Sequence, residues 1–257
     1  MDKDIILLSE PSTAAALFDD WKETMIDSCL QGVMGHIYAD CENEPESAAA
    51  VIGDFCFLAG KPDARFVSYD YGRNFLIMDP QNDEWAQLIE AVCGRRALRR
   101  MRYAIKKEPD CFERKKLLDY IRELPPQYEL QQIDREIYRE CLENDWSRDL
   151  VDCFPSWKKF ENQGLGMVVT ENSHIVSGAA SYTRYIEGIE IEIDTKKEYR
   201  RQGLATAAGD ALILECLDRG LYPSWDAQNL WSVALAEKLG YSFDYEYPVY
   251  EVYYRKK

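Results

Sequence analysis

The feature that most constrains the fold is a strand, a short loop and a helix that follow one another between residues 189 and 217. Isoleucine occupies positions 189, 191 and 193, and acidic residues occupy positions 190, 192 and 194. This period of two is typical of a strand with one buried face. The loop that follows contains Arg-Arg-Gln-Gly-Leu-Ala at 200–205, and the apolar stretch from Leu204 predicts a helix to about Leu217.

The residue types at 200–205 indicate an anion site at the start of that helix. Gly203 lets the backbone turn and approach a ligand closely, and Ala205 leaves the first helical turn uncluttered. The free N–H groups of a helix start, together with the helix dipole, favour a negative group. Because Arg200 and Arg201 add positive charge beside it, a pyrophosphate is the expected occupant.

The rest of the second half alternates between the two kinds of element. Asp134 precedes one helical pattern, and Gly240 follows another at the place where helices often stop. The predicted order is β-α-α-β-β-β-α-β-α-β, a mixed α/β domain. The predicted strands cover 128–133, 166–170, 175–182, 189–193, 223–225 and 245–254, and the predicted helices cover 134–142, 156–163, 204–217 and 229–239.

The first half has weaker patterns. Apolar residues at helical spacing predict a helix within 11–41, and 48–60 reads as one buried strand. A strand at 75–78 and helices at 84–92 and 113–123 follow. The last helix ends at a double proline, which cannot continue a helix. We therefore expect an N-terminal α/β domain at 1–125 and a second domain at 126–257.

A basic run at 95–107 contains arginine and lysine but no acid. It could be a patch for nucleic acid or phosphate, or the solvated face of an element whose apolar side is Leu98, Met101 and Ile105. That spacing suits a helix, although Met101, Tyr103 and Ile105 also suit a strand. The whole chain has 46 acidic against 31 basic residues, a net charge of −15. Since that charge repels a polyanion, we favour the solvated face and expect no nucleic-acid partner.

Composition excludes several classes of protein. With 46% hydrophobic residues among 257, the chain has enough apolar side chains for a sizeable core. Its longest apolar runs have five residues, against about 20 for a membrane helix, so we expect a soluble, cytoplasmic protein with no membrane partner. The eight cysteines include no CxxC pair and read as reduced buried thiols, and only two histidines are present, so we expect no metal site.

Residues 128–257 resemble the GNAT (GCN5-related N-acetyltransferase) superfamily. The family's acetyl-CoA loop reads Arg/Gln-x-x-Gly-x-Gly/Ala, and Arg200, Gly203 and Ala205 fill its fixed positions. Asn229-x-x-Ser232, followed by Leu-Ala-Glu-Lys-Leu-Gly-Tyr at 235–241, is similar to the family's second helix. Together with Leu-Tyr-Pro-Ser-Trp-Asp at 221–226, the chain looks closest to the branch that contains zwittermicin A resistance proteins. The implied fold is a mixed, mostly antiparallel sheet flanked by helices.

The resemblance implies a binding mode for acetyl-CoA, the cosubstrate of the family. In such enzymes the strand before the loop diverges from the next strand, and pantetheine enters the gap. Its backbone contacts would lie at Ile193 and Thr195, and Asn229 would lie near the thioester arm with Ser232 behind it. The pyrophosphate would meet Arg200 and the amides of the residues that follow it: Arg201, Gln202, Gly203, Leu204, Ala205 and Thr206.

The resemblance also implies an N-acetyltransferase, and its catalytic groups can be sought among the acids of the 189–194 strand. An ammonium must lose a proton before it can attack. We choose Glu190 as the base and Glu192 as second choice, because both lie opposite the isoleucines; a merely solvated strand face is the alternative. A backbone amide within 191–193 would stabilise the oxyanion, as the family does. The family's usual Tyr acid is replaced by Ala236, for which Tyr245, Tyr247 or solvent would substitute.

These residues predict transfer of an acetyl group to a primary amine of a small molecule by direct attack in a ternary complex. The acidic surface favours a cationic acceptor, such as an amino polyol, an antibiotic or a polyamine. A non-catalytic acyl-CoA-binding module is the alternative, suggested by the missing Tyr. The pattern at 75–92 and the basic run resemble the first lobe of tandem GNAT proteins, so the N-terminal domain is expected to be a degenerate or distinct lobe without the coenzyme loop.

Overall fold

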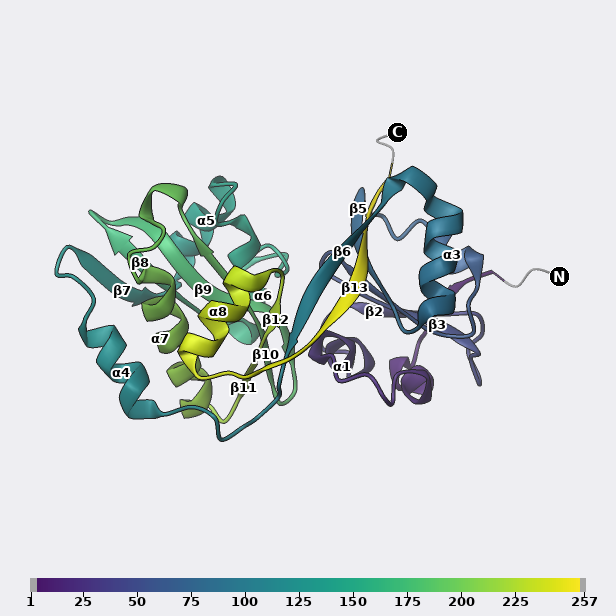
Figure 1. Cartoon of the computed structure of the whole chain (residues 1–257), viewed down its shortest axis with the longest axis horizontal. Coiled ribbons are helices and arrows are strands. Elements are labelled where there is room, and N and C mark those ends of the chain that lie inside the picture. The colour runs from purple at the N-terminus through teal and green to yellow at the C-terminus, as the bar shows by residue number, and fades with distance from the viewer. Residues whose placement is uncertain (1–3, 255–257) are drawn as a thin grey trace. The chain divides into compact units, whose positions relative to one another are not determined.

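The computed structural model describes residues 4–254, and its chain separates into two compact units (Figure 1). The N-terminal unit consists of two segments, one that ends at Arg102 and one that begins at Glu246. The C-terminal unit comprises Tyr103–Tyr245. The chain therefore passes from one unit to the other inside two strands, β6 (Ala97–Ile105) and β13 (Phe243–Tyr253). No helix within 4–254 is long and apolar enough to cross a membrane.

The N-terminal unit is built on a sheet in the order β1-β2-β3-β4-β5-β13-β6. The pairs β1–β2, β2–β3, β3–β4 and β5–β13 are antiparallel, and β4–β5 is parallel. The side chains of Trp85 and Ile89 on α3 are fully buried in the core of this unit. The remaining elements are β1 (Ile6–Leu7), a 3-10 helix (Pro11–Leu17), α1 (Thr24–Leu30), β2 (His36–Ala39), β3 (Ser47–Ile52), β4 (Phe55–Gly60), α2 (Ala64–Ser68), β5 (Phe75–Pro80), α3 (Asp83–Cys93) and a 3-10 turn (Gly94–Arg96).

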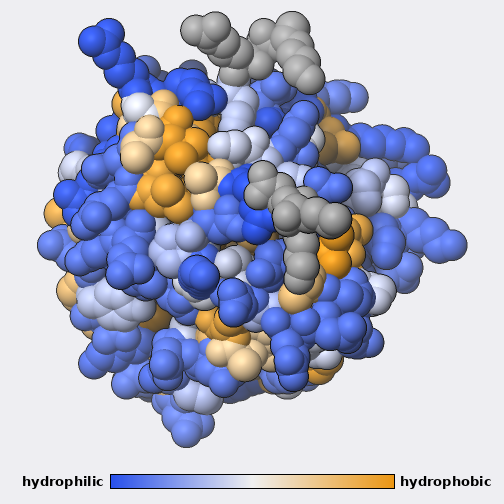
Figure 2. All heavy atoms as spheres, turned by 90° about the vertical axis from the view of Figure 1, so that its right-hand side faces the viewer, coloured by the Kyte–Doolittle hydropathy of each residue, from blue (hydrophilic) through white to orange (hydrophobic). Residues whose placement is uncertain are grey.

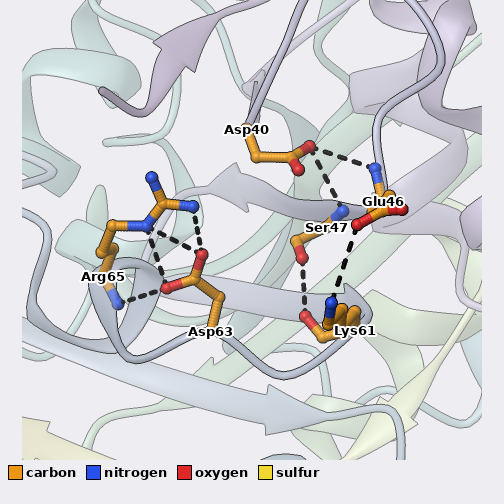
Figure 3. A network of polar contacts seen from close by, with 6 residues as sticks. All are labelled: Asp40, Glu46, Ser47, Lys61, Asp63 and Arg65. Carbon is orange, nitrogen blue, oxygen red and sulfur yellow. Dashed lines mark hydrogen bonds and ion pairs between the residues drawn. The ribbon is translucent and has the colours of Figure 1, made fainter. Parts of the chain in front are cut away.

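Polar contacts fix two loops of this unit (Figure 3). The Asp40 carboxylate accepts the backbone N–H groups of Glu46 and Ser47 at 3.1 and 3.3 Å, and the Ser47 hydroxyl donates to the carbonyl of Lys61 at 2.6 Å. Asp63 caps α2 by accepting the N–H of Arg65 at 2.9 Å. The face of the molecule that this unit forms is largely hydrophilic, with separate small apolar areas (Figure 2). These contacts serve the fold and suggest no chemistry.

The C-terminal unit has a sheet in the order β11-β10-β9-β8-β7, antiparallel except for β10 with β11. A long helix, α7, packs on β8, β9 and β10, and a 3-10 turn at Arg148–Leu150 contacts β9 and β10. The elements are α4 (Arg114–Arg122), β7 (Tyr128–Gln132), α5 (Arg135–Glu143), α6 (Trp157–Gln163), β8 (Gly166–Glu171), β9 (His174–Tyr185), β10 (Gly188–Thr195), a 3-10 turn (Lys197–Tyr199), α7 (Leu204–Asp218), β11 (Tyr222–Ser224), β12 (Asp226–Ala227) and α8 (Leu230–Leu239).

The structure corrects three expectations for the first half. The segment 11–41 is two short helices and a strand, and 48–60 belongs to a hairpin of β3 and β4 that turns at Gly53 and Asp54. The strand alternative for the basic run is confirmed, because 97–105 is strand β6. The expected apolar side is not, because only Ile105 is buried, while Leu98 and Met101 are 40% and 36% exposed. All eight cysteines are free thiols, as expected, but only five are buried: Cys41, Cys111 and Cys153 are half-buried.

The division between the units differs from the one expected at residues 125 and 126. The double proline follows α4 inside the C-terminal unit, because α4 packs on α7 and not on an earlier element. The last strand, β13, pairs through Tyr250 and Val252 with β5, more than 170 positions earlier in the chain. A pairing between segments so far apart leaves no local signal in the sequence. Because of it, the segment that begins at Glu246 belongs to the N-terminal unit.

Candidate active site

Strand β10 separates an apolar face from an acidic one, as its alternation predicts. Ile189 and Ile191 are 0% and 5% exposed and belong to a core cluster with Leu204 and Leu212 of α7. Glu190 lies on the opposite face and is itself only 3% exposed. The packing of α7 on the isoleucine face places the start of α7 close to the end of β10, which is the arrangement an anion site at this corner requires.

Beyond its first residues, β10 has an open edge. Its parallel pairing with β11 runs from Gly188 to Glu190, which is paired with Ser224, the last residue of β11. On the other edge, the Lys196 N–H donates to the Val176 carbonyl of β9 at 3.0 Å. Since antiparallel ladders alternate, the backbone groups of Ile193 and Thr195 point away from β9, toward the open edge. Within 4–254 no strand pairs with these residues there, so a ligand with amide groups can.

The start of α7 lacks a side-chain cap. Gly203 occupies the N-cap in the left-handed region at φ +82, and a Cβ added there would meet nothing within 4 Å. The first helical hydrogen bond joins the N–H of Ala207 to the carbonyl of Gly203 at 3.1 Å. The N–H groups of Leu204, Ala205 and Thr206 precede it and therefore have no intrahelical acceptor. These groups, with the helix dipole, fit a diphosphate.

The polar side chains of the loop hold it in place. Arg200 donates through Nε to the carbonyl of Thr195 at 3.1 Å, and Gln202 accepts the Tyr128 hydroxyl at 2.8 Å. Arg201 has a positive φ of 62 and places its guanidinium 5.3 Å from the ring centroid of Trp231. The loop is thus tied to β10, β7 and α8, while its own residues stay exposed. A preformed loop loses little conformational entropy when it binds.

The acidic face of β10 carries three carboxylates, those of Glu190, Glu192 and Asp194. In the sheet register Glu190 lies opposite Thr183 of β9 and Ser224 of β11, and both of these hydroxyl residues are fully buried. Glu192 is half-buried. Burial raises the pKa of Asp194 to about 6; the carboxylate of Asp149 raises it further and the guanidinium of Arg200 lowers it. The face therefore offers groups able to attract and deprotonate an ammonium.

Asn229 and Ser232, the other two residues of the predicted site, lie at the start of α8. Asn229 is its N-cap, and its side-chain oxygen accepts the N–H groups of Trp231 and Ser232 at 3.0 Å each. The Ser232 hydroxyl accepts the indole N–H of Trp225 at 3.2 Å. Ala236 is fully buried. These contacts give Asn229 and Ser232 structural roles, while their contact with a thioester stays a prediction.

A sequence profile of the GNAT acetyltransferase family matches residues 15–250. The chain belongs to this family. It is 29% identical over 254 residues to an uncharacterised N-acetyltransferase of Bacillus subtilis (strain 168), YdfB, with 93% of this chain and 94% of that protein covered. The GNAT chain is accordingly an N-acetyltransferase, and the family implies acetyl-CoA as donor. The match spans both units, so the N-terminal unit is part of the family's fold.

Solved GNAT structures agree with the fold. A GCN5-related N-acetyltransferase-like protein from Streptococcus suis is 46% identical, with a TM-score of 0.90 over 95% of this chain and 99% of that one. A tandem GNAT protein from the clavulanic acid biosynthesis pathway is 11% identical, with a TM-score of 0.58 over 99% of both chains. The second likeness concerns the fold alone. The chain is thus a mixed α/β protein with two sheets, structurally like GNAT proteins that include a tandem one.

Several residues near the loop were not among the predicted site residues. Asp194 was visible as the third acid of the alternation, but its partial burial was not. Tyr128 and Trp231 are brought to the loop by β7 and α8, a proximity that no spacing in the sequence shows. Tyr241 can be set aside as an acid, because it is buried and donates to the Pro223 carbonyl at 2.6 Å, and burial raises its pKa well above the usual range. The described residues include no group of three His, Cys, Asp or Glu able to hold a metal.

Proposed function

We propose that the C-terminal unit transfers the acetyl group of acetyl-CoA to a primary amine of a small molecule, by direct attack in a ternary complex. One observation carries the proposal: the uncapped start of α7 follows the open edge of β10 along the chain, after a loop that contains the 3-10 turn Lys197–Tyr199. A diphosphate on the first and a pantetheine arm along the second would bring the thioester toward the acidic face.

The chain's own residues provide the binding groups for the coenzyme. The N–H groups of the first turn of α7 hold the diphosphate. The outward backbone groups of Ile193 and the N–H of Thr195, whose carbonyl already accepts the Arg200 Nε–H, bind the amides of the arm. When bound, acetyl-CoA supplies an activated carbonyl to the amine. The predicted coenzyme residues are thus kept as proposed ligands: Ile193, Thr195, Arg200, Arg201, Gln202, Gly203, Leu204, Ala205, Thr206, Asn229 and Ser232.

The base we propose is Glu190, with Glu192 as the alternative. Both lie on the acidic face, and a general base must take a proton from the ammonium before attack. Glu190 is the more buried of the two, with 3% of its surface exposed. A backbone N–H within 191–193 would stabilise the oxyanion. The proton returned to the leaving thiolate comes from Tyr245 or solvent, since Tyr247 belongs to the N-terminal unit.

The acceptor we propose is cationic: an amino polyol, an antibiotic or a polyamine-like molecule. A net charge of −15 attracts cations and repels nucleic acid and anionic membranes, so neither is a proposed partner. The sequence at 221–226 supports placement in the branch that contains zwittermicin A resistance proteins. We further propose a cytoplasmic location.

We also propose that the two units are an active and a degenerate GNAT lobe. The likeness to a tandem GNAT protein over 99% of the chain supports this view. The sequence Arg-x-x-Gly-x-Ala occurs at 200–205 and has no second copy before residue 125. Coenzyme would accordingly bind once per chain.

The test is thiol release from acetyl-CoA in the presence of a panel of amines, with coenzyme binding followed separately by calorimetry. Release with di- and polyamines or amino polyols, and a stoichiometry of one coenzyme per chain, are the expected results. Binding without release across the panel would favour an acyl-CoA-binding module that awaits another acceptor. No binding of coenzyme would refute the proposal.

A further inference from the structure

A lysine on α8 reaches the first turn of α7. The ammonium of Lys238 donates to the hydroxyl of Thr206 at 3.1 Å and lies 5.0 Å from the ring centroid of Tyr120 on α4. Thr206 carries one of the N–H groups that have no intrahelical acceptor. A lysine has three N–H donors, and only one is directed at Thr206. The Lys238 ammonium therefore lies beside the proposed diphosphate site, and it is not among the coenzyme ligands proposed so far.

One helical turn further along α7 lies a carboxylate that the mechanism leaves unused. Asp210 is fully buried, and within the part of the chain that the structure describes neither of its oxygens has a hydrogen-bond partner. Burial raises its pKa to about 7, while Lys238 and Lys116 lower it. These two lysines, on α8 and α4, are the charged groups that act on Asp210 from the helices packed against α7. An ionised Asp210 thus depends on nearby cations.

We propose that Lys238 binds the diphosphate of coenzyme A, and that Asp210 is the buried counter-charge that competes with the diphosphate for this ammonium. The proposal rests on the proposed coenzyme site at the start of α7. A hydrogen bond between an ammonium and a phosphate oxygen is charge-assisted and stronger than a neutral one. Here it adds to a helix start that already favours an anion.

The competition links coenzyme binding to protonation of Asp210. When Lys238 turns to the diphosphate, Asp210 loses a stabilising cation and has new negative charge nearby, so its proton affinity rises. By linkage, the coenzyme binds more weakly as the pH rises through the range in which free Asp210 loses its proton. The structure thereby makes coenzyme affinity sensitive to pH near neutrality.

The first experiment measures the dissociation constants of CoA, 3′-dephospho-CoA and pantetheine for the wild type and for Lys238→Met. We expect a loss of about 10-fold for both CoA and 3′-dephospho-CoA, and no change for pantetheine. Lys238→Arg should restore most of the affinity, because it keeps the charge. Lys115→Met, which removes an exposed lysine of α4, is the matched control and should bind as the wild type does.

The second experiment follows 3′-dephospho-CoA binding from pH 6 to 8.5, since its diphosphate stays ionised over this range. The wild type should lose several-fold in affinity as the pH rises. Asp210→Asn keeps the shape of the side chain and should bind with nearly constant affinity; its melting temperature reports whether it folds. The wild-type curve tests the linkage even if that variant does not fold.

Each failure points to a different claim. If the wild type does not bind CoA, the proposed function itself is wrong. If it binds CoA and Lys238→Met binds equally well, only the role of Lys238 is refuted. A loss confined to CoA would assign Lys238 to the 3′-phosphate and overturn the diphosphate assignment. A wild-type affinity that is constant with pH, or a slope unchanged in Asp210→Asn, would overturn the role of Asp210.

Discussion

The starts of α7 and α8 differ in one respect: the first turn of α8 is capped by a side chain, and the first turn of α7, where we propose the diphosphate site, is not. Asn229 begins α8 in extended backbone, and its side chain accepts two N–H groups of the first turn. Gly203 begins α7 in the left-handed region and has no side chain to offer. The N–H groups of α8 are therefore partly satisfied by the chain itself, whereas those of α7 are left for an outside acceptor.

Other helices support this comparison. α3, α5 and α6 are capped by the side chains of Asn82, Asp134 and Ser156. Helix starts without such a cap also occur at α1 and α4, so a missing cap alone does not identify a site. What distinguishes α7 is that its uncapped start follows β10 and its open edge along the chain. The absence of a cap and the presence of an adjacent free strand edge together define the site.

The largest effect should come from Gly203→Glu. A carboxylate at this position would lie among the N–H groups that we assign to the diphosphate, and each lost charge-assisted contact costs roughly 1.5–3 kcal/mol, or about 10- to 100-fold in affinity. We expect CoA binding and acetyl transfer to fall below detection, as measured by calorimetry and thiol release.

Gly220→Glu is the matched control for that variant. Gly220 also has a positive φ, +67, and open space around an added Cβ, but it lies past the other end of α7. The backbone strain should be similar in the two variants, and Gly220→Glu should keep coenzyme binding. Equal loss of binding in both would mean that strain, and not the anion site, explains the result.

The next largest effect concerns removal of the proton from the acceptor amine, and its variant leaves the starts of α7 and α8 unchanged. Glu190→Gln should lower turnover by roughly 100-fold or more and raise the pH optimum, because the amine must then lose its proton without a base. CoA affinity should not change. Steady-state kinetics and calorimetry measure the two quantities, and Glu192→Gln is the companion variant. If turnover falls only in Glu192→Gln, the base is Glu192.

Much of the C-terminal unit could be predicted from sequence because its signals are local. The period of two in β10, the caps Asp134 and Asn229, and the stop at Gly240 each act within a few residues. The helix start at Gly203 was also predicted from such local signals, while the anion site there stays a prediction. The hairpin of β3 and β4 was missed although Gly53 and Asp54 form a two-residue turn of a kind common in hairpins, because the flanking alanines lack alternation.

What the sequence could not provide is proximity between distant segments. Lys238 meets Thr206 across two helices, and Tyr128 meets Gln202 from a strand more than 70 positions earlier. The partial burial that raises the pKa of Asp194 depends on the chain around it, not on its own neighbours in sequence. Such contacts follow from packing, so the acids of β10 could be recognised and ordered from sequence, but the burial of each one could not be predicted.

A smaller effect is expected at the capped helix start. Asn229→Ala should lower the free energy of unfolding by about 1 kcal/mol, because two N–H groups of α8 lose their acceptor. Asn229→Asp keeps an acceptor and should preserve stability. Thermal or denaturant unfolding measures this effect, and kinetics on the same proteins test whether Asn229 has a second role. A fall in turnover in a fully folded Asn229→Asp protein would show that its amide also contacts the thioester arm.

The smallest effect concerns Asp194, at the end of β10 just before the uncapped start of α7. Its pKa is raised to about 6 in the folded protein, against about 3.9 for an unfolded chain. Between these two pKa values the folded state binds more protons than the unfolded chain does. The free energy of unfolding therefore falls as the pH rises from about 4 to 6. Asp194→Asn should accordingly melt at a higher temperature than the wild type at pH 7.5, and the difference should vanish near pH 4. Asp145→Asn, an exposed acid in the turn after α5, should show no such dependence. An equal shift at both pH values would mean that the fold does not raise the pKa of Asp194.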